Sequence, residues 1–360
     1  MNPSQSSSTI ASPPREGPGV GWFVALLGLL GSLFILDLAW GSVSIPFNEV
    51  LSWLTGQSTS EQGWDNILTY LRLPKACSAV LVGGALAVGG LMMQTLFRNP
   101  LAGPSVLGLT AGASLGVALV MLSSGAATSI LAIQQLGIGG SSLMVLAASM
   151  GAGLVMGLIL LMSFRIRDHV VLLILGIMLG FLTTAVVSIW QYFSSPEQIQ
   201  DYLIWTFGSL GGQSPAQLQI MALVIGLALL LAFIQSKSLN LLLLGEAYAR
   251  SMGLSVKPAR AWIIALTSLL AGTVTGFCGP IGFIGIAVPH LARSLFQTAD
   301  HRYLIPLNVL LGAVVMLACD LIASLPGSAV SLPINAVTAL VGAPVVIWVI
   351  LRRGNLGASF

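Results

Sequence analysis

The residue types that most often perform chemistry are few in this chain and stand apart from one another. Its three histidines, His169, His290 and His301, lack the spacing of a zinc site. None of its three lysines follows a glycine, so the sequence has no G-x-x-x-x-G-K-[ST] loop for nucleotide phosphates. Its apolar segments hold no paired carboxylates, Ser–Lys pair or His cluster. This pattern argues against an intramembrane enzyme.

The cysteines and the acids within apolar segments are equally sparse. Cys77, Cys278 and Cys319 are an odd set, each in or beside an apolar segment, and they indicate neither a disulfide framework nor a metal site. Asp37 and Asp320 lie near segment ends. A carrier driven by an ion gradient usually needs charged or unwound coordination at mid-membrane. A transporter with this sequence is therefore expected to draw energy from another subunit, and an ion-coupled secondary transporter of a small solute is the alternative.

Long apolar segments are the elements that must position any site. Hydrophobic residues make up 56% of the 360 residues and charged residues only 7%, against about 25% charged residues in soluble domains. Most of the segments are long enough to cross about 30 Å of hydrocarbon. The sequence predicts an all-α polytopic membrane protein, with one permease-like domain over 22–353. Its ten transmembrane helices are expected at 22–40, 76–97, 104–122, 143–164, 170–193, 216–234, 261–277, 279–296, 304–322 and 334–351.

The basic residues orient these segments. Of the 14 Lys and Arg residues, all but Arg72 and Lys75 fall in alternate gaps, which the positive-inside rule places in the cytoplasm together with both termini. The first 21 residues are rich in Ser, Pro and Gly and are interpreted as a disordered cytoplasmic tail rather than a signal peptide. Residues 354–360 are expected to form a cytoplasmic C-terminal tail. The net charge of +3 is ordinary for such a protein and indicates no nucleic-acid partner.

Proline and glycine shape several of the segments. Pro280 and Pro289 interrupt 279–296, yet the charge pattern favours a real, broken crossing packed in protein or lining a cavity. Pairs at G-x-x-x-G spacing predict closely packed helices, or helices that slide against each other. These pairs are Gly112 and Gly116, Gly153 and Gly157, Gly176 and Gly180, and Gly272 and Gly276.

The loops carry short helical patterns. The outer loops 41–70 and 194–215 each contain one, at 46–54 and 196–207. In the inner loop 238–258, Gly245 permits a turn, and Glu246 to Met252 form a short amphipathic helix ended by Gly253. Such a helix suits a groove in another protein. The alternative is a helix that rests on the lipid surface.

Polar residues within the apolar segments indicate a translocation path. Thr184, Ser188 and Gln191 recur at steps of four and three residues, so they share one helix face. A large chelate needs a path with few strong contacts, and sparse hydroxyls on an apolar wall meet that need. Hydrogen bonding between helices is the alternative. The predicted path residues are Gln94, Thr184, Ser188, Gln191, Asn335 and Thr338.

Three sets of motifs, in this order along the chain, resemble one known family. The first joins L-R-L-P-K at 71–75 to Q-T-L-F-R-N-P-L-A-G-P-S-V-L-G at 94–108. The second is L-G-E-A-Y-A-R-S-M-G at 244–253. The third is G-P-I-G-F-I-G-I-A-V-P-H-L-A-R at 279–293, followed by D-H-R and by T-A-L-V-G-A-P at 338–344. Together they resemble the FecCD-type permeases of ABC importers, which take up iron–siderophore complexes, haem and cobalamin.

The resemblance implies a fold, an assembly and a location. Such permeases have ten spans and pair as homodimers around a central path in the bacterial cytoplasmic (inner) membrane. Two cytoplasmic ATPase subunits dock on them, and a periplasmic substrate-binding protein delivers the ligand. The chain itself would then be no enzyme and bind no cofactor, since ATP and Mg are used by the ATPase. Iron chelates are the first expectation for the cargo, with cobalamin as the other possibility.

The resemblance also implies roles for individual residues. Lys75 stands where the family often has Arg, and Ser324 stands where some members place a further outer Arg. The dimer seam is expected at the fifth and tenth spans. The implied sites are ATPase coupling at Gly245, Glu246, Ala249, Arg250 and Gly253, binding-protein docking at Arg72 and Lys75, and a cytoplasmic gate at Asp168 and His169.

Overall fold

A computed structural model of the chain describes residues 18–122, 140–166, 168–324 and 331–353. Every regular element in these ranges is a helix, as the apolar composition predicts. Most of the expected N-terminal tail and all of the C-terminal tail, 354–360, lie outside the described residues.

A helix lies in each of the ten stretches expected to cross a bilayer. These helices are α1 (Val20–Ala39), α4 (Leu73–Leu96), α5 (Leu109–Met121), α7 (Gly140–Arg165), α8 (His169–Phe193), α10 (Pro215–Ile234), α13 (Val256–Cys278), α14 (Ile284–Phe296), α15 (His301–Ala323) and α16 (Ile334–Arg353). In the described ranges, seven helices are long and apolar enough to span a membrane, whereas α5, α14 and α16 give shorter apolar helices. The helical class is confirmed, and ten complete crossings stay a prediction.

Short helices connect the long ones. α2 (Phe47–Leu54) and α9 (Pro196–Thr206) lie where the outer-loop patterns predict them. α9 begins with a capping box, in which the Ser195 and Gln198 side chains each accept a backbone N–H of the other. The remaining elements are α3 (Gln62–Ile67), the π-helical turn η1 (Leu68–Arg72), the 3-10 turn η2 (Pro104–Leu107), α11 (Ser236–Leu243) and α12 (Glu246–Ser251).

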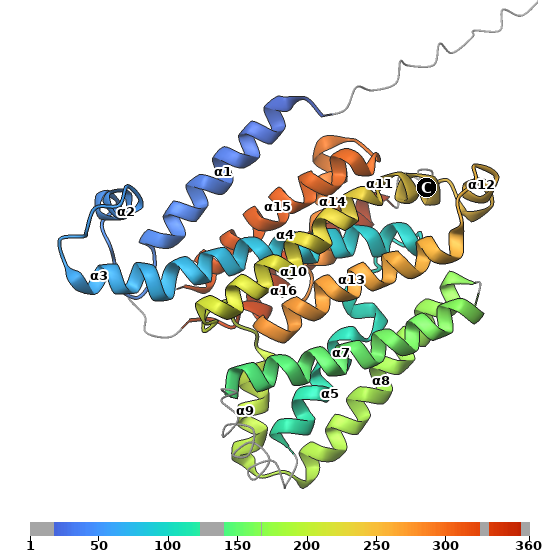
Figure 1. Ribbon diagram of the computed structural model, residues 1–360, viewed down its shortest axis with the longest axis horizontal. Coiled ribbons are helices and arrows are strands. Elements are labelled where there is room, and N and C mark those ends of the chain that lie inside the picture. The colour runs from blue at the N-terminus through green and yellow to red at the C-terminus, as the bar shows by residue number, and fades with distance from the viewer. Residues whose placement is uncertain (1–17, 123–139, 167, 325–330, 354–360) are drawn as a thin grey trace, which may run out of the picture.

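Helix α4 is the centre of the bundle. It packs against α13, α14 and α15, and 83% of its most apolar stretch is buried, whereas the corresponding share is 17% for α1 and 22% for α8 and α10. Figure 1 shows α4 running through the middle, with α1 along one edge and α5, α7 and α8 grouped on another. The outer helices present large apolar side chains, which hydrocarbon can cover.

Glycine sets how closely the central helices approach. A Cβ atom on Gly83 would overlap the carbonyl oxygen of Gly312, and one on Gly312 would overlap the carbonyl oxygen of Gly83. Helices α4 and α15 therefore meet backbone to backbone, which glycine permits. Gly90 meets Gly285 of α14 in the same way. These contacts lie outside the G-x-x-x-G pairs, so spacing within one helix did not predict them.

The predicted glycine pairs differ from one another. Gly112 and Gly116 of α5 lie so close to α7 that a side chain on either would overlap its backbone. Close packing is confirmed there. Gly153 and Gly157 are different, because nothing in the described part of the chain lies within 4 Å of a Cβ built on either.

The eighth apolar stretch is broken, as the sequence predicts. The backbone leaves α13 through Gly279, with a φ of 73°, and enters α14 after Phe283, with a φ of 65°. Asn335 of α16 holds this segment: its Oδ1 accepts the Gly282 N–H at 3.0 Å, and its own N–H donates to the Phe207 carbonyl at 3.1 Å. Non-helical backbone is tolerated at membrane depth where protein satisfies its polar groups.

The substitution Gly83→Ala tests the contact between α4 and α15. The added methyl group must force the two backbones apart, so we expect the free energy of unfolding to fall by about 1–3 kcal/mol. Gly157→Ala is the matched control, because its Cβ position is open and alanine favours the helix. Thermal unfolding in detergent, followed by tryptophan fluorescence, compares them. Equal melting temperatures for the two variants would contradict the role assigned to Gly83.

Candidate functional site

A short helix, α12, occupies the loop that the sequence predicts as a partner site. Gly245 starts it with a φ of 103°, a conformation that side chains rarely allow. Gly253 ends it with a φ of 86°, and the Leu254 N–H returns to the carbonyl of the buried Ala249 at 2.9 Å. The predicted turn, helix and stop are all present.

Helix α12 carries an exposed apolar stripe. Leu244 precedes the turn at Gly245, whereas Tyr248 and Met252 are four residues apart along α12 and its C-cap and therefore share a face. Their exposed fractions are 63%, 47% and 59%. Large apolar side chains at this spacing are the usual anchors of a helix bound in a groove.

The carboxylate of Glu246 ties α12 to the membrane helices. It forms ion pairs with Arg260 of α13 and with Arg250, the latter at 3.0 Å. Arg260 is only 4% exposed, and its Nη1 donates to the Ile166 carbonyl at 3.0 Å, directly after α7. One guanidinium thus joins α12, α13 and the end of α7. The sequence indicates only an inner charge at Arg260, because this residue lies directly before the expected span 261–277.

A second polar network ties α11 to α15 and α4. Asn240 Nδ2 donates to Asp300 Oδ1 at 2.7 Å, and Asn240 Oδ1 accepts the backbone N–H of His301 at 2.8 Å. The His301 ring bridges two helices, because its Nδ1 lies 2.7 Å from Asn240 Oδ1 and its Nε2 lies 2.8 Å from Thr95 Oγ1. The loop that carries α12 is therefore attached to the bundle at two points.

Asp300 is the N-terminal cap of α15. It accepts the Arg302 N–H at 2.9 Å. Burial acts to raise the pKa of the Asp300 carboxyl, but hydrogen bonds from Asn240 and Arg302 outweigh it and leave that pKa below its usual value. The stabilisation from this cap is therefore present at neutral pH and is lost as the pH falls through the lowered pKa.

The predicted gate residues Asp168 and His169 lie where α8 begins. Asp168 Oδ1 accepts the Val170 N–H at 2.8 Å and the Val171 N–H at 3.4 Å, so this carboxylate caps α8. The His169 side chain and Arg167 fall outside the described residues. A gate role for Asp168 and His169 stays a prediction.

The two outer bases make contacts within the chain. Arg72 is 8% exposed and donates to the Leu38 carbonyl at 2.6 Å and to a second carbonyl between α1 and α2. The Lys75 ammonium lies 2.9 Å from Asp320 Oδ1 and 2.6 Å from Ser324 Oγ. These bases hold α4 against α1 and α15. Docking of a binding protein by Arg72 and Lys75 stays a prediction.

Three of the predicted path residues make contacts in the interior. Gln94 is buried, and its amide donates to the Ile286 carbonyl at 3.2 Å and accepts from Arg293 at 2.7 Å. Asn335 holds the segment before α14, and the buried Thr338 donates to the Asn335 carbonyl at 3.0 Å. The Gln94 and Asn335 contacts join separate segments of the chain, as in the alternative of hydrogen bonding between helices, whereas the Thr338 bond lies within α16. Whether these residues also line a path is a prediction.

The other three path residues lie together on α8. Thr184 and Ser188 are exposed and Gln191 is partly exposed. The Thr184 hydroxyl donates to the Gly180 carbonyl at 2.9 Å, and the Ser188 hydroxyl donates to the Thr184 carbonyl at 3.0 Å. Each hydroxyl therefore uses its proton in a hydrogen bond to its own helix, so the two side chains present only a weakly polar surface.

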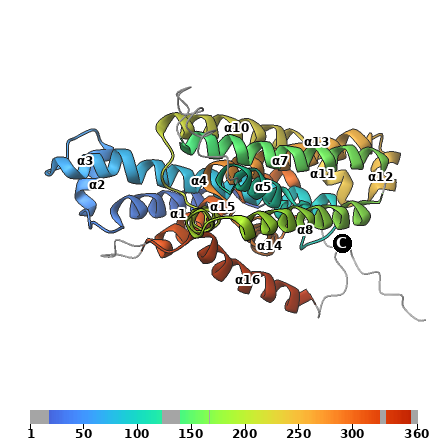
Figure 2. The same cartoon turned by 90° about the horizontal axis from the view of Figure 1, so that it is seen from below.

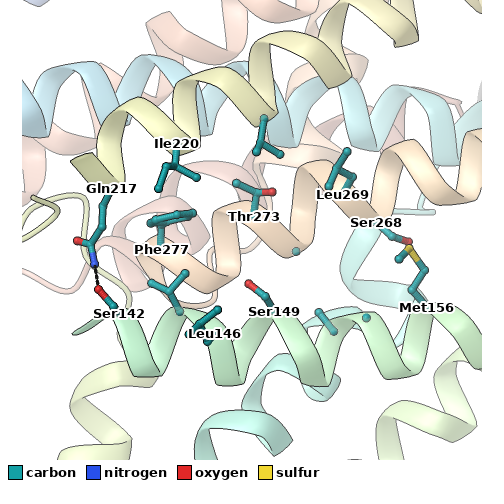
Figure 3. Close-up of a pocket in the computed structure, with 15 residues that line it drawn as sticks. Ser142, Leu146, Ser149, Met156, Gln217, Ile220, Ser268, Leu269, Thr273 and Phe277 are labelled. Carbon is teal, nitrogen blue, oxygen red and sulfur yellow. Dashed lines mark hydrogen bonds between the residues drawn. The ribbon is translucent and has the colours of Figure 1, made fainter. Parts of the chain in front are cut away.

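A cavity of about 570 Å³ lies elsewhere, between α7, α10 and α13. Figure 3 shows a polar pair at one end, where Gln217 Nε2 donates to Ser142 Oγ at 3.1 Å. Much of the remaining wall is apolar and includes Leu146, Ile220 and Phe277. None of the six predicted path residues lines this cavity.

Comparison with known proteins places the chain among membrane permeases. A model of the FecCD transport family matches residues 29–352. The Vitamin B12 import system permease protein BtuC of Klebsiella pneumoniae is 36% identical over 337 residues, covering 93% of this chain and 95% of that protein. The Hemin transport system permease protein HmuU of Yersinia pestis is 35% identical over 329 residues, covering 91% and 94%. A solved inward-facing structure described as a metal-chelate type ABC transporter has a TM-score of 0.79 and 28% identity, covering 93% of this chain and 100% of that one.

The substitution Lys75→Met tests the ion pair with Asp320. The Asp320 side chain is 2% exposed and would keep a buried charge without its cation. We expect a loss of about 3 kcal/mol, the lower end for broken buried pairs, because the Lys75 side chain is 29% exposed. The double variant Lys75→Met with Asp320→Leu should recover most of this loss. Thermal unfolding in detergent measures both, and a double variant no more stable than Lys75→Met would contradict the pairing.

Proposed function

The chain belongs to the FecCD transport family, and we propose that it is the permease subunit that couples ATP hydrolysis in the cytoplasm to import across the bacterial inner membrane. It is a multi-pass membrane protein of an ABC importer family. Permeases of this kind leave ATP hydrolysis to a separate ATPase subunit. That partner, rather than this chain, would bind ATP and Mg.

Two features of α12 together support the coupling proposal. One is its exposed apolar stripe, and the other is the ion pair of Glu246 with the buried Arg260. An ATPase groove that binds Tyr248 and its stripe neighbours can push or pull the helix. Movement of α12 must then displace Glu246 and, through it, the buried Arg260. Since Arg260 also holds the Ile166 carbonyl, the displacement reaches the end of α7. The predicted gate at Asp168 follows two residues later.

An ion-coupled carrier has less support. Such a carrier needs a coordinating group that can load and release an ion in the membrane. Asp320 is held by Lys75 at 2.9 Å, and the unwound backbone before α14 is held by Asn335. Asp320 and this backbone segment thus have internal partners.

We propose a metal chelate as the cargo, with an iron chelate as the first candidate. Vitamin B12, hemin and metal chelates appear in the names of the relatives, and each is a metal ion enclosed in an organic ligand. A bulky rigid solute moves through a path only if it is not trapped by strong contacts. The hydroxyls of Thr184 and Ser188 already donate to their own helix and fit this requirement.

The outer side would receive the cargo from a periplasmic substrate-binding protein. Lys75 keeps 29% of its side chain exposed and is the better candidate of the two outer bases for a docking contact. Such a rim charge steers and orients a partner more than it adds affinity. This arrangement rests on both termini lying in the cytoplasm.

The substitution Glu246→Gln tests the function through the anchor of α12. The neutral amide weakens the contacts with two guanidinium groups by about 1.5–3 kcal/mol, so we expect ATP-driven uptake to fall about tenfold or more. The assay uses proteoliposomes with the cognate ATPase and binding protein, and offers hemin, cyanocobalamin and a ferric siderophore in parallel. Glu197→Gln, an acid at the start of α9, is the control and should leave uptake unchanged.

The outcomes separate the parts of this proposal. Uptake driven by an ion gradient without ATP would overturn the assignment as an ABC importer subunit. Normal uptake by the Glu246→Gln variant would leave the importer intact and remove the coupling role of α12. Transport of cyanocobalamin alone would replace the iron chelate as cargo.

We further propose that two copies of the chain form the permease. Each chain presents one α12, whereas a pair of ATPase subunits needs two such helices, and a two-fold dimer supplies them. We propose that the contact between the two copies is formed by α8 and α16. Figure 2 shows both helices on the side of the bundle away from α10. Large side chains on α8 such as Phe181 and Ile189 are 65% and 59% exposed.

Cysteine cross-linking tests this seam. With Cys77, Cys278 and Cys319 replaced, Ser188→Cys should give a covalent pair of identical chains. Leu223→Cys is the control, because this α10 position is 73% exposed on the opposite side and should give none. The products are read on a denaturing gel, together with the mass of the active complex. An active complex that contains a single copy of the chain would contradict the dimer.

A further inference from the structure

A second cavity, of about 460 Å³, lies where α7 ends and α13 begins, next to α12. Its lining is unlike that of the cavity between α7, α10 and α13, because it contains three bases and two hydroxyl groups. The polar lining residues are Ser163, Arg250, Ser255, Lys257 and Arg260, and the others are Ile166, Leu254, Val256 and Pro258.

The charges around this cavity are unbalanced. Arg250 and Arg260 share one carboxylate, that of Glu246. Lys257 is exposed and forms no ion pair with any residue that the structure describes. Three cations around one anion leave an excess of positive charge, which favours an anionic ligand.

The backbone adds to this preference. Helix α13 begins at Val256, on the cavity wall, so the positive end of its dipole lies there. The Ser255 side chain makes no capping hydrogen bond with the first turn. The Ser255 hydroxyl is a further donor along the same wall, whereas the Ser163 hydroxyl already donates to the Leu160 carbonyl at 2.8 Å.

The cavity also lies against the apolar surface of a membrane-spanning helix. On α13, Trp262 lies four residues after Pro258 of the cavity wall, so the two share a face, and Trp262 is 55% exposed. A ligand with a charged head and an apolar tail could therefore keep its tail on α13 while its head occupies the cavity. Basic pockets of this kind between transmembrane helices on the cytoplasmic side suit phospholipid head groups.

We propose that this cavity binds the phosphate head group of an anionic phospholipid, held by Lys257, the two guanidinium groups and the start of α13. The bound phosphate would neutralise the excess charge beside the Glu246–Arg260 anchor. It would thereby make the stability of the junction between α12 and α13 depend on the lipid composition of the membrane. This binding does not depend on the proposed transport function.

Lipid titration of the purified, delipidated protein, followed by native mass spectrometry, tests the site. We expect dioleoyl phosphatidylglycerol to bind more tightly than dioleoyl phosphatidylcholine, which has the same tails. Lys257→Gln should weaken the phosphatidylglycerol complex about fivefold, as expected for one base at a membrane surface, and Lys257→Arg should preserve it. Lys237→Gln is the matched control, because Lys237 is an exposed base on α11 outside the cavity.

Three results would overturn the proposal. The first is equal binding of the two lipids. The second is an equal loss in the Lys257→Gln and Lys237→Gln variants, which would indicate a diffuse surface charge. The third is displacement of phosphatidylglycerol by millimolar inorganic phosphate, which would assign the cavity to a soluble anion. Monodisperse variants with unchanged melting temperatures exclude misfolding as the cause of any loss.

Discussion

Hydrocarbon offers no hydrogen-bond partner, so every polar group at membrane depth must find one within the protein. Two irregular points of the structure follow this constraint. The unwound backbone before α14 is closed by Asn335 through Gly282. The charge of Asp320 is balanced by Lys75. Polar side chains that stand out in an apolar sequence therefore serve first to hold helices together, and only those left at the surface, such as Ser188, remain open to a solute or a second chain.

The same constraint makes the centre of the molecule stiff. Backbone contacts of α4 with α15 and α14, at Gly83 and Gly90, leave no side chain to yield between the helices. Packed interfaces of this kind transmit a displacement rather than absorb it. Helix α12 is joined to this body by the Glu246–Arg260 ion pair, while Asn240 fixes the preceding helix to α15. A force applied to α12 thus acts on membrane helices through short, partly buried connections.

The basic residues at the ends of α7 and α13 serve several physical purposes at once. Their number on one side of the chain sets the orientation in the membrane. Arg260 in addition positions α12 and the end of α7. The excess charge that remains around Lys257 is the basis for an anion site at the same place. Coupling and lipid contact would then meet in one small region, because a single carboxylate, Glu246, cannot balance three cations.

The sequence by itself determined the features that depend on local order. Apolar periodicity and caps predicted the helical class, α9 and the turn at Gly245, because these follow from residues only a few positions apart. The motif order identified the family. The tertiary structure alone decided which residues meet across the chain. Gly83 and Gly312, or Glu246 and the buried Arg260, are brought together by helix packing, and no spacing along one helix encodes the position of a partner on another. For the same reason, only the fold shows that the Arg72 guanidinium donates to the backbone carbonyl of Leu38 on α1 and to a second carbonyl between α1 and α2.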